Sequence, residues 1–386
     1  MVLGQDTIVV NGAGQRQNAV TAGQSVPAAS MNSARNGKSN ATIYDVAMVA
    51  GVNPSTVSRA LSKSGRVSAR TQKLIEAAAT GLNFHANPFA RALHTGRTNT
   101  FGLIVADLTS PASFDIIRGA GITATVRNYT LALAGSADST VTELIAARRM
   151  MATVDGLILA SPCMDDDDIR TLARDKPVVV INREVDGVPC VVPDESKGIR
   201  EAVRSLAANG HTKVAFVAGP PQSPMSIRRW EAVQASCEFS RLDAVRLDSS
   251  RPTVDGGRQV AQDVRASGVT AVLTSNDLLA FGLMQELQAA GMVVPDEISI
   301  VGFDDIFGAG FTTPPLTTVR SPREECGSGA ATLLLDLLHG TALSSGVPTI
   351  VTELVQRGSS GRVSARKMSP ARCRRHEIEA ELRRRA

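Results

Sequence analysis

Between residues 99 and 361, short apolar runs alternate with segments of helical periodicity. The apolar runs are Phe101–Ala106, Thr130–Ala134, Gly156–Ala160, Val178–Ile181, Val214–Ala218, Ala271–Thr274 and Ile298–Gly302. Helical segments that separate them include Val141–Ala152, Gly198–Asn209, Gly257–Ser267 and Leu278–Ala290. Continuous apolar strands joined by helices are typical of a parallel sheet covered on both faces. Seven or more such strands are more than a single open sheet in a chain of this type readily accommodates. Two stacked α/β lobes with a cleft between them are therefore predicted.

The period of the apolar residues changes before residue 99, where short helices are predicted. Apolar positions 43, 46, 47 and 50 share one helical face. Thr42 precedes them as a suitable N-cap, and Gly51 ends the helix. Asn53 offers the next N-cap, and Pro54 occupies the first helical position, where proline is tolerated. The pattern therefore predicts two helices joined by a tight glycine turn.

Two further helices are predicted in the same part of the chain. Ser68 is a candidate N-cap for a third helix, and Gly81 is expected at the C′ position just past its end. A fourth, shorter helix is expected from Asn87 through Leu93, with Gly96 ending it. The segment thus forms a small all-α module that precedes the α/β part.

The charge distribution separates the same two parts. The chain carries a net charge of +4. Residues 42–98 hold seven basic and two acidic residues and are therefore at +5, whereas residues 99–361 are acidic overall and residues 362–386 are basic. A basic module on an acidic body indicates that one end of the protein meets a polyanion. A basic surface without a partner remains the alternative on charge alone.

Composition excludes several classes of protein. The five cysteines, Cys163, Cys190, Cys237, Cys326 and Cys373, form no CxxC or Cys/His cluster, so neither a disulfide framework nor a zinc site is predicted. This cysteine usage fits a reducing cytoplasm, and no signal peptide or apolar membrane span is present. The acidic run Asp165–Asp168 is interpreted as a helix start. No nucleophile–base constellation or GxSxG motif occurs, so no catalytic residue, metal or cofactor is expected.

The helix pair around Gly51 has the form of a helix-turn-helix. Its second helix would lie in the major groove, with Pro54 and Ser55 near base edges. Arg59, one turn later, can bind a guanine through two hydrogen bonds, and the hydroxyls of Thr56 and Ser58 suit phosphates. An αα-hairpin packed inside a larger domain is the alternative.

Residues 42–98 closely resemble the headpiece of the lactose-repressor (LacI/GalR) family. The matching pieces are Thr42-Ile43-Tyr44-Asp45-Val46-Ala47, Gly51-Val52-Asn53-Pro54-Ser55-Thr56-Val57-Ser58-Arg59-Ala60-Leu61, Val67-Ser68-Ala69-Arg70-Thr71, Gly81-Leu82-Asn83-Phe84, Asn87-Pro88 and Leu93-His94-Thr95-Gly96-Arg97-Thr98. The similarity continues more loosely to Gly361. One departure is Asn128, which stands before Tyr129 where the family usually has glycine.

The resemblance implies a set of DNA-binding residues. It assigns the fourth helix the role of a hinge helix that folds on the operator, with Leu93 as a minor-groove wedge that kinks the duplex. The alternative for Leu93 is an ordinary core leucine. The full predicted set is Thr42, Tyr44, Pro54, Ser55, Thr56, Ser58, Arg59, Arg66, Asn87, Arg91 and Leu93.

The resemblance also implies an effector site in a periplasmic-binding-protein-like core. Ligands of such folds lie between the lobes, outside the carboxyl ends of the strands. The matched positions each follow an apolar run: Asn182, Arg183, Arg229, Asn276, Asp304 and Ser321, with Arg228 as the alternative to its neighbour Arg229. Their side chains can form directional hydrogen bonds with the hydroxyls of a sugar or nucleoside.

The predicted protein is a dimeric, cytoplasmic transcription regulator, most simply a repressor, that binds a pseudo-palindromic operator under the control of a small effector. Induction and corepression both stay open. The rival interpretations are a solute-binding receptor with the same core fold and an enzyme on a doubly wound fold. The predicted domains are a disordered extension (1–41), a helix-turn-helix domain (42–85), a hinge helix (86–98), a two-lobed core of parallel sheets (99–361) and a basic tail (362–386).

Overall fold

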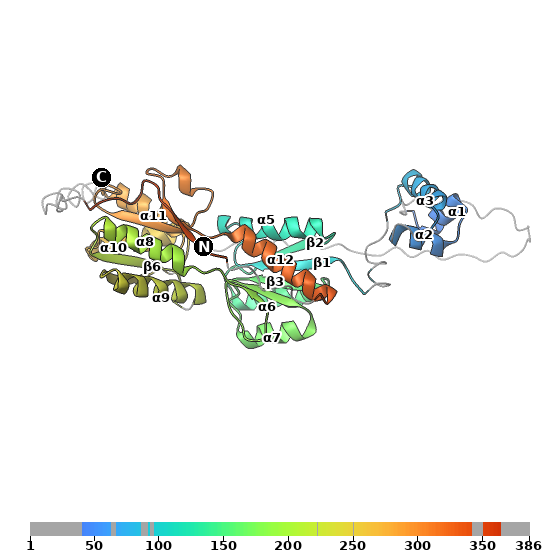
Figure 1. Cartoon of the computed structure of the whole chain (residues 1–386), viewed down its shortest axis with the longest axis horizontal. Helices are drawn as coiled ribbons and strands as arrows, with labels where there is room; N and C mark the ends of the chain where they lie inside the picture. Colours follow the sequence, from blue (N-terminus) through green and yellow to red (C-terminus); the bar gives the residue numbers. More distant parts are fainter. Residues whose placement is uncertain are drawn as a thin grey trace, which may run out of the picture. The chain divides into compact units, whose positions relative to one another are not determined.

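A computed structural model describes residues 41–62, 67–85, 92, 96–221, 223–249, 251–341 and 350–363 of the chain. The chain divides into two units, residues 1–86 and 87–386. The described part of the first unit contains α1 (Ile43–Ala50), α2 (Pro54–Ser62) and α3 (Ala69–Gly81) (Figure 1). The predicted disordered extension, most of the predicted hinge helix and nearly all of the basic tail lie outside the described residues.

The three helices of the first unit enclose one small apolar core. Its buried members come from all three helices: Val46, Ala47, Val57, Ala60, Ile75 and Ala78. Their spacing repeats the helical period within each helix, so the packing follows from the pattern of apolar residues. Gln72 of α3 adds a polar link, because its side-chain amide donates to the carbonyl of Ala60 in α2 at 3.4 Å.

The ends of these helices follow local signals in the sequence. Thr42 and Asp45 form a reciprocal capping box, and the hydrogen bonds from Thr42 lower the pKa of Asp45. Gly51 adopts φ +65°, the left-handed conformation that ends α1. The expectation for Gly81 was wrong, because Gly81 is the last residue of α3 and Asn83 carries the positive φ of 49°. Asn is the non-glycine residue that best tolerates this conformation.

The first lobe of the second unit is a parallel sheet of five strands in the order β2-β1-β3-β4-β5. The strands are β1 (Thr100–Val105), β2 (Thr130–Gly135), β3 (Gly156–Ala160), β4 (Val178–Ile181) and β5 (Cys190–Val191). The helices are α5 (Pro111–Val126), α6 (Thr140–Met151), α7 (Asp166–Asp175) and α12 (Arg323–His339). In Figure 1, α5 and α12 lie over one face of this sheet, and α6 and α7 lie over the other.

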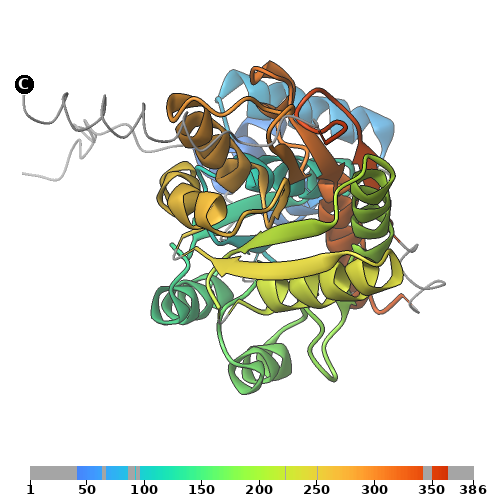
Figure 2. The same ribbon diagram turned by 90° about the vertical axis from the view of Figure 1, so that its left-hand side faces the viewer.

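The second lobe is a sheet of six strands in the order β11-β10-β9-β8-β6-β7. The strands are β6 (Lys213–Ala218), β7 (Asp243–Asp248), β8 (Ala271–Thr274), β9 (Ser299–Asp304), β10 (Thr317–Arg320) and β11 (Glu353–Val355). The helices are α8 (Ser196–Ala208), α9 (Pro224–Phe239), α10 (Val254–Ala266) and α11 (Asp277–Ala289), with a short 3-10 turn η1 (Ala309–Phe311). Helices α8 and α9 cover one face and α10 and α11 the other (Figure 2, where β7 is the yellow strand).

The prediction of two α/β lobes with parallel sheets is confirmed. All seven predicted strands are present, and the acidic run begins α7 with Asp165 as its N-cap. The antiparallel edge strand β11, which pairs with β10, was not predicted. Asn128 has φ +58°, which explains how it replaces the glycine usual before Tyr129.

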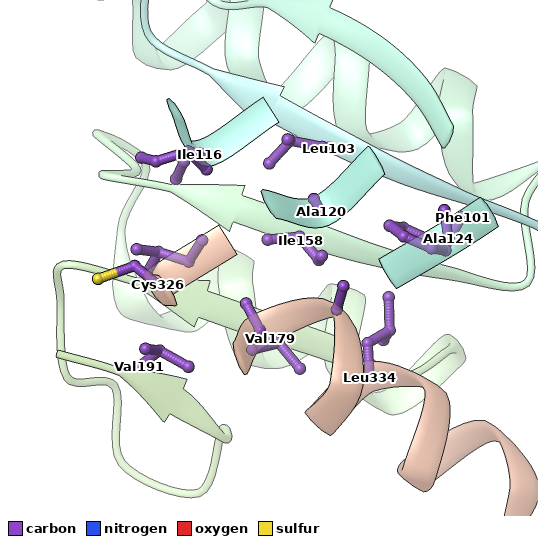
Figure 3. Packing of buried hydrophobic residues seen from close by; sticks show 14 of the residues in the cluster. Phe101, Leu103, Ile116, Ala120, Ala124, Ile158, Val179, Val191, Cys326 and Leu334 are labelled. Atoms are coloured by element: carbon purple, nitrogen blue, oxygen red, sulfur yellow. The ribbon is translucent and has the colours of Figure 1, made fainter. Parts of the chain in front are cut away.

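Helix α12 belongs to the first lobe although it follows β10 of the second lobe in sequence. Its buried side chains, among them Cys326 and Leu334, pack with Ile116 and Ala120 of α5 over the strands (Figure 3). Burial of each large aliphatic side chain in this layer contributes about 1.5–3 kcal/mol. The chain therefore crosses between the lobes before α8, after β10 and again before β11.

Two glycines allow α5 and α12 to approach closely. A Cβ atom on Gly119 of α5 would overlap the backbone carbonyl of Glu324, and one on Gly327 of α12 would overlap that of Ile116. Arg118 adds an ion pair to Glu324 at 2.6 Å, which is exposed and therefore of small value. The two helices are thus fixed against each other by backbone contact.

Candidate functional site

The exposed face of α2 carries the residues that the sequence predicts to contact DNA. Ser55, Ser58 and Arg59 are exposed at spacings of three and four residues, whereas Val57 and Ala60 of the same helix are buried. Residues at these spacings share one side of a helix. The helix therefore presents one polar, basic face to solvent and packs its opposite face against α1 and α3.

Local hydrogen bonds order the start of this face. The Asn53 side chain accepts from the backbone amide and hydroxyl of Ser55, both at 3.2 Å. The Arg59 guanidinium donates to the carbonyl of Ser55 at 3.2 Å and to the hydroxyl of Thr56 at 3.4 Å. These contacts hold the arginine along the helix, at the end that carries Ser55.

The other predicted DNA-binding residues divide into two groups. Thr42 forms the N-cap of α1, Pro54 begins α2, and Tyr44 is 69% exposed. Arg66, Asn87, Arg91 and Leu93 lie outside the described residues. The role of Leu93 and of the hinge helix therefore stays a prediction.

The second candidate site lies at the carboxyl ends of the parallel strands. Ser161 follows β3, Asn182 follows β4, and Asp304 ends β9. These three non-glycine residues have positive φ angles of 55°, 65° and 113°. Such conformations cost of order 1–3 kcal/mol each and concentrate at functional sites. Ser161 and Asp304 therefore store strain at the strand ends where the sequence predicts an effector.

Arg229 of α9 is a deeply buried charge at these strand ends. Its side chain is 2% exposed, and it forms an ion pair with Glu195 at 2.5 Å and lies 3.6 Å from a carboxylate oxygen of Asp304. It also donates to the carbonyl of Ser275, and its guanidinium lies 3.6 Å from the ring centroid of Phe303. The buried guanidinium is therefore compensated by two carboxylates and an aromatic face.

Asp304 joins the two lobes through a second arginine. Arg323, the first residue of α12, donates to the same oxygen of Asp304 that faces Arg229, and both side chains are buried. The Nε atom of Arg323 is buried without a hydrogen-bond acceptor. Sequence reasoning missed Arg323 and Glu195, because neither follows an apolar run in the way the matched positions do.

A second contact between the lobes involves Asn182. Arg228 of α9 donates to the carbonyl oxygen of Asn182 at 2.8 Å, and the Asn182 amide donates to the hydroxyl of Ser161 at 3.0 Å. Arg228 and Arg229 thus have distinct roles: the former reaches the first lobe, and the latter lies in the buried charge cluster.

Arg183 and Asn276, two of the remaining predicted effector residues, each form hydrogen bonds within one lobe. Arg183 donates to the carbonyls of Pro162 and Met164 at 3.0 and 2.8 Å and pairs with Asp166 at 2.5 Å. Asn276 caps α11, accepting from the amide of Leu279 at 2.9 Å and donating to Pro252 at 2.8 Å. Ser321 is buried just beyond β10. Arg183 and Asn276 therefore support the loops of the site in this structure.

Asp277, next to the predicted Asn276, is a further buried acid at the strand ends. Its carboxylate accepts from the Thr318 hydroxyl at 2.6 Å and from the amide of Ile306 at 2.9 Å, which fixes the loop after Asp304. Burial and the nearby Asp304 carboxylate raise its pKa well above the ordinary value.

The cluster at the strand ends can form directional hydrogen bonds and balance charge. Glu195 and Asp304 oppose Arg229 and Arg323, so the four buried groups sum to zero. No group of His, Cys, Asp and Glu that could hold a metal occurs in the described part of the chain. None of the helices there is long and apolar enough to cross a membrane. A separate groove of about 250 Å³ between α8 and α9 contains none of the predicted effector residues.

Comparison with known proteins agrees with this division of the chain. Residues 42–87 match the bacterial regulatory proteins of the lacI family, and residues 203–360 match a periplasmic binding protein-like domain. The HTH-type transcriptional repressor CytR of Escherichia coli (strain K12) is 31% identical over 333 residues, which cover 83% of this chain and 96% of that protein. The ribose operon repressor of the same strain is 30% identical over 331 residues, covering 83% of this chain and 100% of that protein.

Solved structures extend the likeness to the fold. The Lac repressor dimer bound to operator and an anti-inducer superposes with a TM-score of 0.76 at 26% identity, covering 84% of this chain and 100% of that chain. A LacI-family regulator from Enterococcus faecium with bound ribose superposes with a TM-score of 0.62 at 26% identity, covering 69% and 100%. The chain contains a helix-turn-helix unit and a two-lobed core, as these proteins do, and it belongs to the lacI family of bacterial transcriptional regulators.

Proposed function

We propose that the protein is a dimeric repressor that binds a pseudo-palindromic operator and is controlled by a sugar or nucleoside bound between its lobes. The single observation that carries this proposal is the buried charge cluster of Glu195, Arg229, Asp304 and Arg323. It joins the two lobes at the strand ends, where ligands of such folds bind.

The DNA-binding half of the proposal rests on α2. Its exposed face carries the small polar residues Ser55 and Ser58 beside Arg59, which leaves this side of the helix accessible to the major groove. Arg59 would read a guanine, while Ser55 and Thr56 lie at the end of the helix that approaches the bases or the phosphates. Two copies of this module match the two half-sites of a palindrome.

The effector half rests on the chemistry at the strand ends. Carboxylates and amides such as Asp304 and Asn182 bind hydroxyl groups in a directional way. The regulator from E. faecium is described with bound ribose, and the E. coli relative that is 30% identical to this chain is a ribose operon repressor. A polyhydroxylated ligand such as ribose can compete with Arg229 and Arg323 for the carboxylate of Asp304. This competition would change the contact between the lobes.

Dimerisation is proposed by analogy with the Lac repressor dimer and is supported by one exposed apolar pair. Phe307 and Phe311 are 84% and 73% exposed, and their rings meet edge to face with centroids 5.1 Å apart. Exposed aromatic pairs are enriched in interfaces between proteins. A second copy of this chain is the occupant we propose for this surface.

We also infer that the protein has no enzymatic activity and acts in the cytoplasm. The relatives are transcriptional regulators, and binding to operator DNA requires access to the chromosome. In this view the arginines at the strand ends serve recognition and coupling between the lobes.

Ligand-dependent stabilisation tests the proposal. Thermal unfolding is measured for the full-length protein with D-ribose, other pentoses and hexoses, and nucleosides, because a ligand that binds the native state raises Tm. A ligand that raises Tm should lose its effect in Asp304→Asn and keep it in Asp305→Asn. The latter alters a neighbouring carboxylate that pairs with Arg320 and Arg357 instead. An equal response of both variants would contradict a ligand site at Asp304.

A further inference from the structure

The chain enters the first lobe at residues 97–99, and two groups hold it there. Asp155 accepts from the backbone amide and hydroxyl of Thr98 at 2.7 and 2.8 Å and from the amide of Asn99 at 2.9 Å. Arg97 donates to the carbonyl oxygen of Leu338 at 2.7 Å. We call residues 97–99 the linker root, since the DNA-binding unit precedes them in the chain.

Leu338 lies in the last turn of α12, and Arg323 is the first residue of the same helix. The 17 residues of α12 span about 25 Å at the usual rise of an α-helix. Arg323 contacts Asp304 of the second lobe at one end, while the Leu338 carbonyl contacts Arg97 at the other. One helix therefore connects the candidate effector site with the linker root.

The surroundings of α12 make it a stiff connection. Its residues Ala330, Ala331, Leu334 and Leu335 have no exposed surface and pack in the core of the first lobe. Gly119 and Gly327 bring its backbone against that of α5, which prevents independent bending of the N-terminal half. A displacement of one end is therefore carried to the other end, because packed interiors transmit strain.

We propose that α12 couples the effector site to the DNA-binding unit, with Arg323 and Arg97 as the positioning residues at its two ends. The inference rests on the proposed function, because a ligand that engages Asp304 weakens the contact that holds the first turn of α12. Together with α5, the helix then shifts relative to the sheet of its lobe, and the Leu338 carbonyl moves relative to Arg97. The contacts that attach the linker root to the first lobe change as a result.

Hydrogen–deuterium exchange tests this coupling without DNA or effector. The readout is the exchange rate of the Thr98 and Asn99 amides in the full-length protein, because both amides bind Asp155 and exchange when the root opens. Arg323→Gln should raise these rates by about 2- to 30-fold, the range of measured coupling along packed networks. The amides of α6, in the same lobe, should stay unchanged.

The double variant distinguishes coupling through α12 from general loosening. In an Arg97→Gln background the three bonds to Asp155 remain, so the two amides still report on the root. Adding Arg323→Gln to that background should produce no further increase. Arg320→Gln is the matched control, because it removes the exposed ion pairs to Asp305 and Glu353 in the second lobe and leaves α12 intact.

Two results would overturn the inference. The first is that Arg323→Gln leaves the exchange rates at Thr98 and Asn99 unchanged. The second is that Arg323→Gln raises these rates equally in the wild-type and Arg97→Gln backgrounds. If Arg323→Gln fails to fold, Asp304→Asn weakens the same contact while conserving shape, and the same two criteria apply. Since exchange is measured on the free protein, its outcome is independent of whether an operator or effector is found. Failure of the proposed function would appear instead as the absence of any sugar or nucleoside that raises Tm and of any DNA sequence that the protein prefers.

Discussion

Arg229 and Glu195 form a buried ion pair, with guanidinium nitrogen and carboxylate oxygen 2.5 Å apart and the two side chains 2% and 9% exposed. The pair joins α9 to the residue that precedes α8, at a crossing between the lobes. Such a pair fixes geometry more than it adds stability, because both charges lose their hydration. Removal of one partner is therefore more harmful than removal of both.

Glu195→Gln should reduce the free energy of unfolding by about 3 kcal/mol, because Arg229 would keep only the more distant Asp304 carboxylate. The double variant Glu195→Gln/Arg229→Met should recover at least half of that loss. Urea unfolding followed by the fluorescence of Trp230, the single tryptophan, reports on this lobe.

The control for this pair is Asp255→Asn, which breaks the exposed ion pair with Arg258 on α10 of the same lobe. Exposed pairs of this kind contribute about 0–1 kcal/mol, so a small effect is expected. If Glu195→Gln is as mild as Asp255→Asn, the buried pair does not have the role assigned to it.

Gly119→Ala and Gly121→Ala form a matched pair on α5. The added methyl at Gly119 would overlap the carbonyl of Glu324, whereas at Gly121 the nearest atom is a Leu131 methyl carbon at 3.8 Å. Gly119→Ala should therefore destabilise the protein by about 1–3 kcal/mol, as overpacking does. Gly121→Ala should stabilise it by about 0.4–1 kcal/mol through the unfolded state. Equal effects of the two substitutions on Tm would show that α5 and α12 do not pack this closely.

The sequence predicted those parts of the structure that depend on local signals. The caps at Thr42 and Ser68, the turn at Gly51 and the seven apolar strands all follow from neighbours within a few residues. Gly81 was misplaced because helix ends are set by the last packed turn, and Asn83 can adopt the left-handed conformation as well.

The sequence predicted where the candidate site lies, but only some of the residues that form it. Asn182 and Asp304 were expected because the resemblance to the LacI/GalR family matches them to effector positions, each next to an apolar strand. The pairs Glu195–Arg229 and Arg323–Asp304 join residues 34 and 19 positions apart in elements whose packing no local pattern encodes. Asn276 was predicted to bind the effector, but in the structure it caps α11. A polar residue after a strand is equally suited to either role, so the sequence alone does not distinguish them.

His211 should make stability depend on pH. Burial lowers its pKa below the ordinary value of 6.5, and both ring nitrogens are engaged, with Thr270, Ser299 and the carbonyl of Gly361. The unfolded chain therefore binds the proton more readily than the native protein, and stability falls as pH drops below 6.5 towards the folded pKa.

His211→Gln should remove this component of the pH dependence. Tm measured from about pH 7.5 to about 5.5, the range in which histidine titrates, should fall less steeply in the variant than in the wild type. His85→Gln, at an exposed position of the helical unit, serves as the control and should keep the wild-type slope. Parallel slopes for His211→Gln and the wild type would exclude His211 as the titrating group.

Arg59→Ala should relax the preference for one base pair in each half-site, at a cost of about 1–3 kcal/mol per contact. Arg70→Ala is the matched control, because Arg70 is an exposed arginine on α3 of the same unit. We expect it to change affinity equally for all sequences, if at all. Competition binding with single-base variants of the selected operator measures both effects, and an unchanged base preference in Arg59→Ala would remove this residue from base recognition.

Selection of bound sequences from a random double-stranded DNA library, with the full-length protein at a fixed and stated salt concentration, tests the central claim most directly. We expect enrichment of a pseudo-palindrome whose half-sites lose one preferred base pair with Arg59→Ala. The selection is repeated with sugars and nucleosides present, because a regulator that depends on a corepressor binds its operator only when that ligand is bound. Absence of enrichment under every condition would contradict the assignment of this protein as an operator-binding regulator.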